Sequence, residues 1–351
     1  MKILITGAAG FIGSNFTHFI VEKYPSYKVI ALDNLSPYSN MENISSLEKD
    51  NKIIFEKADI IDFEKISEIY KKYEIDNVVN FAAESHNDRA IIDPSIFAKV
   101  NALGAQQLLE ASRQFNVKRH IHISTIEVYG EQGKDTPYFT ENSPLNAKTP
   151  YSAAKAAGDL LVRAYMQTYE DMDICITHCA NNYGPYQFPE KLIPLAVSNL
   201  IQGKKVALYG DGKQRRDWLH VYDHCLAIDL ILQMKERPSF GKDAATQASK
   251  LPIYDISARN EVTNIDIVKI ILEEMNLDFD KWVEFVADRP NHDRRYLINP
   301  EKIETQLNFK PTINFDKGIR ETVRWYMDNE KWWRDILKRS NNLQIDWSKS
   351  K

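Results

Sequence analysis

Three glycines near the N-terminus constrain the fold of this chain more than any other feature. Gly7, Gly10 and Gly13 follow the apolar run Ile3-Leu4-Ile5 and precede an amphipathic stretch from Ser14 to Lys23. At this spacing between a strand and a helix, glycines allow a tight turn, close helix–strand packing and close approach of the backbone to a pyrophosphate. The N–H groups at the start of such a helix attract the same anion. The spacing therefore predicts a dinucleotide-binding site.

An acidic residue supports this prediction and indicates which dinucleotide binds. Asp33 follows the second apolar run, Val29-Ile30-Ala31-Leu32, where the hydroxyls of the adenosine ribose are expected. A carboxylate at that place accepts hydrogen bonds from the ribose and repels a 2′-phosphate. The sequence therefore favours NAD over NADP.

Apolar runs alternate with helical patterns in the first half of the chain. Further runs occur at 53–55, 78–81 and 121–124, and helical patterns fit 63–73 and 95–115. Such alternation indicates an α/β fold with a Rossmann-like, doubly wound parallel sheet.

Beyond Pro185 the alternation loosens. Short β-like pieces such as 206–209 are mixed with proline and glycine, and helices fit 263–276 and 316–334. We expect an NAD-binding domain over 1–185 that also includes about 220–256. We expect a smaller, interleaved α/β substrate domain over 186–341 and a loose polar tail over 342–351.

Composition excludes several classes of function. The 351 residues are 43% hydrophobic and 27% charged, as in ordinary globular proteins. A net charge of −4 without a dense Lys/Arg run argues against nucleic acid and anionic membranes as partners. No apolar stretch approaches the ~20 residues needed to cross a bilayer, and the N-terminus lacks a signal-peptide pattern. Cys175, Cys179 and Cys225 are poorly spaced for metal binding, so we predict reduced core thiols, no metal and a cytoplasmic protein.

A tyrosine and a lysine form the candidate reactive pair. Tyr151 and Lys155 are four residues apart in a helical pattern over 151–169, so they share a helix face. A lysine ammonium near a phenol lowers its pKa and makes it a usable base. Ser124 and Thr125 end the preceding apolar run and can hydrogen-bond the same substrate hydroxyl.

These motifs resemble the extended short-chain dehydrogenase/reductases, and most closely the dTDP-glucose 4,6-dehydratase family, over nearly the whole chain. Besides the glycine turn, Thr125, Tyr151 and Lys155, the resemblance rests on long strings of low degeneracy. These strings are Phe81-Ala82-Ala83-Glu84-Ser85-His86, Asn181-Asn182-Tyr183-Gly184-Pro185-Tyr186, Glu190-Lys191-Leu192-Ile193-Pro194, Arg216-Asp217-Trp218-Leu219-His220 and Asp288-Arg289-Pro290-Asn291-His292-Asp293-Arg294-Arg295-Tyr296.

The resemblance implies a reaction on the hexose of a nucleotide-diphosphate sugar. Tyr151 takes the proton of the 4-hydroxyl while hydride leaves C4 for NAD. The 4-ketone acidifies the C5 hydrogen, which Glu127 removes. Water leaves from C6 and the hydride returns there, which gives a 4-keto-6-deoxy sugar. NAD is therefore expected to stay tightly bound and to be recycled.

The resemblance also implies the residues of two binding sites. Those expected to bind NAD are Gly7, Gly10, Phe11, Ile12, Gly13, Asp33, Asn34, Asp59, Ile60, Ala82, Ala83, Tyr151, Lys155 and Asn182. Those expected to bind the nucleotide sugar are Ser85, Thr125, Ile126, Asn181, Glu190, Lys191, Arg216, Asn260, Arg289, His292 and Tyr296. Arginine suits this role because its forked donors pair with phosphate oxygens.

Three positions depart from the family pattern, and one of them is Asn291, which replaces a usual glycine. Ile126 stands where the family usually has an aspartic acid that protonates the departing 6-hydroxyl, and Asn87 stands in place of a usual valine. Loss of a general acid typically costs roughly 10²–10⁴-fold in rate. Three interpretations follow. The protein is a 4,6-dehydratase in which Glu127 or a water chain supplies the proton, or it is a related enzyme that keeps only C4 oxidation, such as an epimerase, decarboxylase or 5,6-dehydratase. In the third, the protein binds sugar nucleotides without turnover.

In the extended short-chain family, helices equivalent to 95–115 and 151–169 pair across a two-fold axis. Both stretches carry small and apolar residues at helical spacing, namely Ala102, Leu103, Ala105, Leu108, Leu109, Leu160, Leu161 and Ala164. We therefore expect a homodimer.

Overall fold

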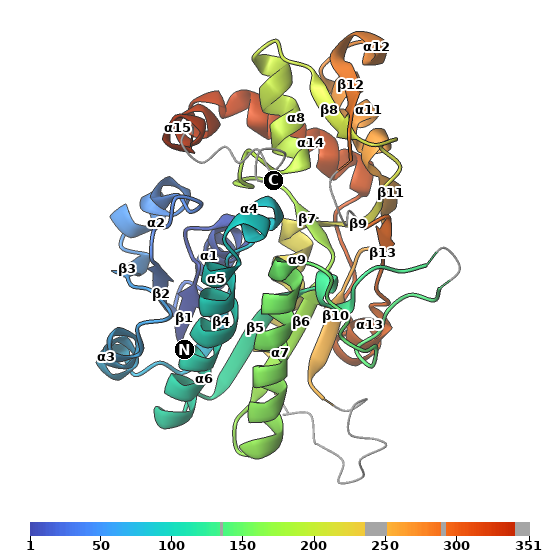
Figure 1. The fold of residues 1–351 in the computed structure, drawn as a ribbon. Coiled ribbons are helices and arrows are strands. Elements are labelled where there is room, and N and C mark those ends of the chain that lie inside the picture. The colour runs from blue at the N-terminus through green and yellow to red at the C-terminus, as the bar shows by residue number, and fades with distance from the viewer. Residues whose placement is uncertain (134–135, 236–250, 289–292, 341–351) are drawn as a thin grey trace.

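The computed structural model describes residues 1–133, 136–235, 251–288 and 293–340 (Figure 1). Its centre is a seven-stranded sheet with the strand order β10-β6-β5-β4-β1-β2-β3, in which every neighbouring pair is parallel. The strands are β1 (Lys2–Thr6), β2 (Lys28–Asp33), β3 (Ile53–Lys57), β4 (Asn77–Asn80), β5 (Arg119–Thr125), β6 (Ile174–Cys179) and β10 (Ile253–Ile256). The strand order reverses between β1 and β4, and ligands bind beyond the carboxyl ends of the strands at such a point. The predicted fold class is confirmed.

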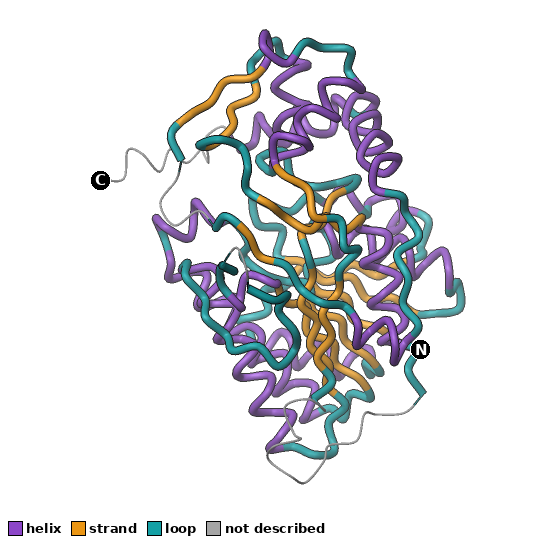
Figure 2. Tube along the Cα trace, turned by 90° about the vertical axis from the view of Figure 1, so that its right-hand side faces the viewer, coloured by secondary structure: helices purple, strands orange, loops and turns teal. Residues whose placement is uncertain are grey.

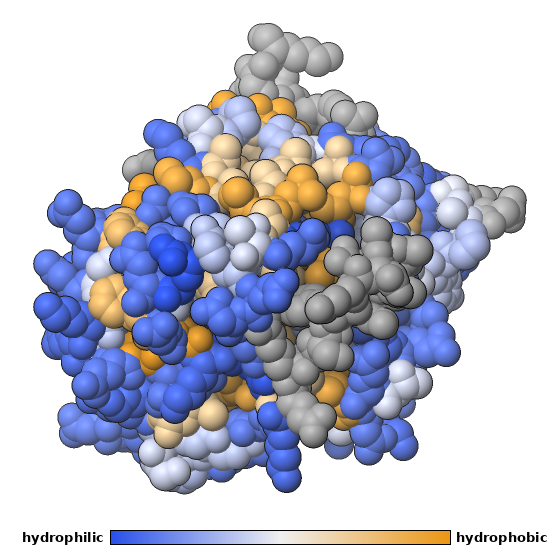
Figure 3. Space-filling view, turned by 90° about the horizontal axis from the view of Figure 1, so that it is seen from below, coloured by the Kyte–Doolittle hydropathy of each residue, from blue (hydrophilic) through white to orange (hydrophobic). Residues whose placement is uncertain are grey.

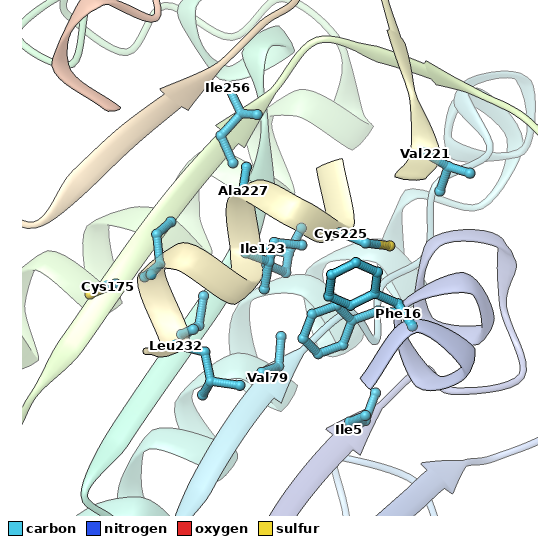
Figure 4. Packing of buried hydrophobic residues seen from close by; sticks show 14 of the residues in the cluster. Ile5, Phe16, Val79, Ile123, Cys175, Val221, Cys225, Ala227, Leu232 and Ile256 are labelled. Carbon is cyan, nitrogen blue, oxygen red and sulfur yellow. The ribbon is translucent and has the colours of Figure 1, made fainter. Parts of the chain in front are cut away.

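Alternate side chains of the strands pack against helices on the two faces of the sheet. Ile3 and Ile5 share a core with α1 (Phe11–Lys23) and α9 (Val221–Leu232). Figure 4 shows this core, where Phe16 of α1 and Cys225 and Leu232 of α9 cover β4 and β5. Leu4 points the opposite way, because successive strand residues face opposite sides, and packs with α3 (Phe63–Tyr73) and α6 (Ala105–Gln114).

The stretch 95–115 is helical throughout, but it is not one regular helix. It consists of α5 (Pro94–Ala98), the π-helical η2 (Lys99–Gly104) and α6. Within η2, Asn101 bonds both backbone groups of Glu84: its Oδ1 accepts from the N–H and its Nδ2 donates to the carbonyl, each at 2.9 Å. The irregular turn thus fixes the loop after β4. π-Helical turns are frequent at functional sites.

The smaller part of the molecule holds two minor sheets and most of the C-terminal helices (Figures 1 and 2). Its strands are β7 (Asn181–Tyr183), β8 (Val206–Tyr209), β9 (Arg215–His220), β11 (Glu261–Thr263), β12 (Val283–Val286) and β13 (Arg295–Tyr296). Its helices are α8 (Leu192–Ile201), α11 (Asn264–Glu274), α12 (Phe279–Trp282), α14 (Phe315–Asp328) and α15 (Glu330–Ser340), while α13 (Glu301–Leu307) contacts β10 and α9. A separate hydrophobic core joins α8, α11, α14 and α15. The short elements η1 (Met41–Asn43), α2 (Ser45–Lys49), η3 (Ile126–Tyr129) and α4 (Asn87–Ile92) and the long helix α7 (Pro150–Thr168) complete the described secondary structure.

The expectation of a single helix over 316–334 is wrong. The helix breaks at Asn329, whose φ of −109° and ψ of 40° are not helical. The break turns α15 back toward the core, so that Trp333 becomes fully buried and the Trp332 indole N–H donates to Asn43 Oδ1 at 2.9 Å. Burial of two large aromatic side chains outweighs the cost of interrupting a helix. The expected tail over 342–351 lies outside the described residues.

The described helices were also compared with what a lipid bilayer requires. None of them is both long enough and apolar enough to span a membrane.

Candidate active site

A cavity of about 340 Å³ lies beyond the carboxyl ends of β1, β2, β4 and β5. Every residue predicted to bind NAD lines it. These are Gly7, Gly10, Phe11, Ile12, Gly13, Asp33, Asn34, Asp59, Ile60, Ala82, Ala83, Tyr151, Lys155 and Asn182. Residues far apart in the sequence therefore meet where the sheet topology predicts a ligand.

The glycine turn leaves no room for side chains. Gly7 has a φ of +66°, and a Cβ built there would lie 2.7 Å from Ala82 N. A Cβ on Gly13 would lie 2.1 Å from the Gly7 carbonyl oxygen. Helix α1 begins after Gly10, which offers no side-chain cap, so the first N–H groups of the helix are left for a ligand. This turn fits a pyrophosphate.

Two acidic residues mark the end of the cavity expected to receive adenosine. Asp33 accepts hydrogen bonds from the N–H groups of Ala9 (3.0 Å) and Leu35 (2.8 Å). Burial raises its pKa, and the bonds from Leu35, Ser39 and Ala9 oppose this shift. Asn34 Nδ2 donates to Asp59 Oδ2 at 3.0 Å.

The reactive wall is built from the end of β5, from η3 and from the start of α7. Thr125, Ile126, Glu127, Tyr151 and Lys155 all line the cavity. The Thr125 Oγ1 accepts from the N–H of Glu127 at 3.3 Å, which begins η3. Ile126 is 2% exposed and presents only hydrocarbon.

The pKa of Tyr151 is not lowered in this structure, contrary to the expectation from its lysine neighbour. Burial raises it well above the usual value, the negative charge of Glu127 adds to the shift, and a hydrogen bond with Thr125 opposes it. The Lys155 ammonium instead donates to the Ile123 carbonyl at 2.8 Å. Burial lowers the pKa of Lys155, against the effect of Asp159.

A buried polar network lies beneath this wall. The His178 ring bonds Asp159 Oδ2 through Nε2 (3.0 Å) and Asp255 Oδ1 through Nδ1 (3.1 Å), and Ser124 Oγ donates to Asp159 Oδ2 at 3.0 Å. Burial alone would lower the pKa of His178, but the two carboxylates outweigh it and raise the pKa to about 9. The network holds β5, β6, β10 and α7 in register behind the reactive residues.

Two polar residues near Glu127 were not predicted to act there. Asn87, noted in the sequence only as a departure from the family, donates from Nδ2 to Glu127 Oε2 at 3.2 Å. The second residue is Asp293. Burial and the negative charge of Glu127 raise the pKa of Asp293 to about 6, and the positive charge of Arg216 opposes this shift. No sequence pattern links 87, 127 and 293, because their proximity arises only from the fold.

The predicted substrate residues divide into three groups. Ser85, Thr125, Ile126, Asn181 and Lys191 line the cavity. The other described ones, Glu190, Arg216, Asn260 and Tyr296, do not line it. Arg289 and His292 lie outside the described residues.

Residues of the second group are held by protein contacts. Glu190 pairs with Nδ1 of His86. The Arg216 guanidinium stacks 4.2 Å from the centre of the Tyr296 ring and donates to the Asp293 carbonyl at 2.8 Å. Asn260 Nδ2 donates to the Trp218 carbonyl at 3.1 Å.

Aromatic lining residues were missed in the sequence. Tyr38, His86 and Phe188 form a cluster in which the Tyr38 and His86 ring centroids are 3.9 Å apart, and Trp332 also lines the cavity. Cys179 is buried, as expected of a core thiol, but it too lines the cavity. Tyr38, His86 and Phe188 lie in loops far apart in the sequence, so no spacing relates them to one another.

Metal ligation was also considered. Within the described ranges, no group of three or more His, Cys, Asp or Glu side chains is placed to hold a metal ion.

A parallel sheet in Rossmann order, with the glycine turn facing a Tyr/Lys pair, defines a dinucleotide-dependent short-chain dehydrogenase/reductase. The sequence model of the GDP-mannose 4,6-dehydratase family matches residues 4–322. The dTDP-glucose 4,6-dehydratase of Salmonella typhimurium is 40% identical over 96% of this chain and 95% of its own. The chain belongs to the dTDP-glucose 4,6-dehydratase family of nucleotide-sugar dehydratases.

Solved structures agree with this assignment. The dTDP-glucose 4,6-dehydratase of Streptomyces venezuelae, solved with NAD bound, has a TM-score of 0.87 at 41% identity and covers 96% of this chain and 100% of that one. The corresponding enzyme of Bacillus anthracis in complex with NAD has a TM-score of 0.85 at 40% identity and covers 96% and 99%.

Proposed function

We propose that this protein is an NAD-dependent nucleotide-sugar 4,6-dehydratase, a lyase that converts a dTDP-glucose-like substrate to its 4-keto-6-deoxy product. One observation carries the proposal: Thr125, Glu127, Tyr151 and Lys155 converge in a cavity whose other end is the glycine turn. Relatives of the same family bind NAD and are named for the same reaction on dTDP-glucose.

The cavity fits NAD. The glycine turn and the open N–H groups at the start of α1 suit its pyrophosphate, and the carboxylate of Asp33 suits the adenosine ribose. Asp59 and Ile60, which line the cavity, are proposed to flank the adenine, and Ala82, Ala83 and Asn182, which also line it, are proposed to contact the nicotinamide end of the cofactor. When bound, NAD accepts hydride from C4 of the hexose and returns it to C6.

Tyr151 is the proposed base for the 4-hydroxyl. Burial keeps its phenol neutral in the protein alone. Positive charge beside the ring lowers a phenol pKa, and an oxidised nicotinamide would supply it when bound. Thr125, hydrogen-bonded with Tyr151, orients the same hydroxyl.

Glu127 is the proposed base for the C5 hydrogen. Its carboxylate takes that proton, and the electron pair of the C–H bond moves into the enolate of the 4-ketone. The C6–O bond then breaks, and the leaving hydroxyl needs a proton that the hydrocarbon of Ile126 cannot provide. We propose that Glu127 passes on the proton it has taken, directly or through water, so that one water leaves and the carboxylate is regenerated. Return of the hydride to C6 leaves an enolate, which takes a proton from solvent at C5 and gives the 4-keto-6-deoxy product.

The remaining predicted residues are proposed to hold the nucleotide diphosphate. Lys191, which donates to the Ser85 carbonyl at 3.2 Å, and Asn181 line the cavity nearest the hexose. Arg216, Asn260 and Tyr296 do not line the cavity, although Tyr296 is hydrogen-bonded with Asn181. Arg289 and His292 are proposed from the family pattern alone.

Ile126 also favours one alternative. An enzyme without an acid at this position can keep C4 oxidation and end in a changed configuration, decarboxylation or 5,6-elimination. Mass spectrometry together with NMR after incubation with dTDP-glucose, UDP-glucose and GDP-mannose distinguishes these outcomes. Loss of one water with a new 4-ketone supports 4,6-dehydration, while an unchanged mass with altered C4 or C5 configuration supports the alternative.

The protein is further proposed to form a homodimer through η2 and α7. These helices lie side by side, and Leu103 and Leu160 on them are 45% and 58% exposed. Leu108 and Leu109 are fully buried against the parent sheet and take no part. Figure 3, viewed from below, shows hydrophobic side chains gathered in a band along the upper edge of a mainly hydrophilic face. Leu160→Glu is expected to give monomers at micromolar concentration by analytical ultracentrifugation. Leu195→Glu, at a 39% exposed position of α8, should leave the dimer intact. A monomeric parent protein refutes this arrangement.

Two lesser expectations stay as proposals. The division into an NAD-binding part, 1–185 with about 220–256, and a substrate part, 186–341, is supported by β10, which pairs with β6 at the edge of the large sheet. A cytoplasmic location is supported by three buried cysteines that form no disulfide among the described residues.

A further inference from the structure

Asn87 is the first residue of α4, and its amide lies between two elements of the reactive wall. Nδ2 donates to Glu127 Oε2 at 3.2 Å, and Oδ1 accepts from the Thr149 hydroxyl at 3.3 Å. A carboxylate can only accept hydrogen bonds, so the amide must present its nitrogen to Glu127. The orientation of Asn87 is therefore fixed from both sides.

Thr149 connects this contact to the helix that carries Tyr151. It is the N-cap of α7, and its Oγ1 accepts from the N–H of Ser152 at 3.2 Å. A polar chain thus runs from the carboxylate of Glu127 through Asn87 to the start of α7. Because an N-cap fixes where a helix begins, the chain sets Glu127 and Tyr151 at a defined separation.

Within the described part of the chain, Asn87 is the one protein group hydrogen-bonded to the Glu127 side chain. The adjacent Ile126 is apolar and nearly fully buried, so it cannot orient a carboxylate. The charge of Glu127 raises the pKa of Tyr151, Tyr296 and Asp293, but none of these three side chains is hydrogen-bonded to its carboxylate. The rotamer of Glu127 consequently depends on position 87.

We propose that Asn87 is a positioning residue that holds one oxygen of Glu127 and leaves the other free to take the C5 proton of the hexose. This inference rests on the proposed function, because it needs a C4-oxidised sugar whose C5 hydrogen is acidic. Asn87 lines the cavity, and the proposed role acts through its hydrogen bond to Glu127. Its loss should therefore slow proton removal from C5 and spare hydride removal from C4.

Three variants test this role. Asn87→Ala removes the donor, Asn87→Asp keeps the shape but turns the donor into an acceptor facing Glu127, and Asn87→Gln keeps an amide. Ile91→Ala, at a 45% exposed position of the same helix, is the matched control. Thermal melts establish whether each variant is folded. If Asn87→Ala does not fold, Asn87→Asp serves in its place, because it also removes the hydrogen-bond donor.

Two rates are measured for each variant with dTDP-glucose in D₂O. The first is the single-turnover appearance of bound NADH, which reports C4 oxidation. The second is entry of deuterium at C5, which reports proton exchange there. Loss of a hydrogen bond to a charged group that acts in the C5 step corresponds to about a tenfold to hundredfold decrease in the rate of that step.

The account predicts that Asn87→Ala slows the C5 step by that factor and changes C4 oxidation and KM by less than about threefold. Asn87→Asp should be slower still, Asn87→Gln should recover part of the C5 rate, and Ile91→Ala should match the parent enzyme. An unchanged C5 rate in Asn87→Ala, or equal loss of both rates, overturns the positioning role. If the parent protein gives neither signal with any nucleotide hexose, the proposed function itself is wrong.

Discussion

Substitution of Gly13 by alanine tests whether the glycine turn is built for a pyrophosphate. The added Cβ would lie 2.1 Å from the Gly7 carbonyl oxygen, while ordinary contacts begin at 3.4 Å, so helix and turn must part by 3.4 − 2.1 = 1.3 Å. The obstacle is backbone and cannot rotate away. Overpacking of this kind costs about 1–3 kcal/mol of folding stability.

The larger effect is expected on the cofactor. A displacement of about 1 Å can cost about a hundredfold in a site that depends on exact positioning, so we expect NAD affinity to fall by about that factor. Isothermal titration and the NAD content of the purified protein measure it. Gly10→Ala is the graded control, because its Cβ would stand 3.2 Å from the same oxygen and needs only a small adjustment. Normal NAD affinity in folded Gly13→Ala protein would refute the assignment of the turn.

Four further predictions follow from the site. Tyr151→Phe should lower C4 oxidation by roughly 10²–10⁴-fold in a single-turnover assay while NAD still binds. Asp33→Asn should reduce the preference for NAD over NADP by at least about tenfold in titrations, because the repulsion of a 2′-phosphate is lost. The pKa of Asp293 is raised to about 6, so the folded state binds this proton more tightly than the unfolded state does. The free energy of unfolding therefore falls as the pH rises from about 4 to 6. Asp293→Asn should remove this loss and add about 1–2 kcal/mol at neutral pH in urea unfolding, after allowance for partial exposure. The pKa of His178 is raised to about 9 by its two carboxylate partners, so its protonated form stabilises the folded state. This stabilisation is complete below about pH 6.5 and is lost as the pH rises through 9. The parent protein should therefore lose up to about 3 kcal/mol of its free energy of unfolding over that range, and His178→Asn should not.

The large sheet and its cofactor end could be predicted because their signals are local. A glycine triplet between a strand and a helix, and Asp33 at a strand end, each carry meaning within a few residues. Apolar runs of the central strands likewise mark elements buried on both faces. Every residue predicted for the cofactor consequently lies around one cavity.

The hexose end could be predicted only in part because its geometry depends on distant elements. Asn87, Glu127 and Thr149 meet through α4, η3 and α7, and no spacing in the sequence relates them. The tyrosine–lysine spacing did not reveal that burial dominates the pKa of Tyr151. The break at Asn329 is likewise invisible in a helical pattern, since burial of Trp333 decides it.

The most direct test of the proposed reaction follows one hydrogen through it. dTDP-glucose labelled with deuterium at C4 is incubated with the purified protein, without added NAD, and the product is examined by NMR. The account predicts a 4-keto-6-deoxy sugar with the label at C6, because the hydride taken from C4 is stored on bound NAD and returned there. A label found again at C4 in an epimerised or unchanged hexose would contradict 4,6-dehydration and identify an enzyme that keeps only the oxidation.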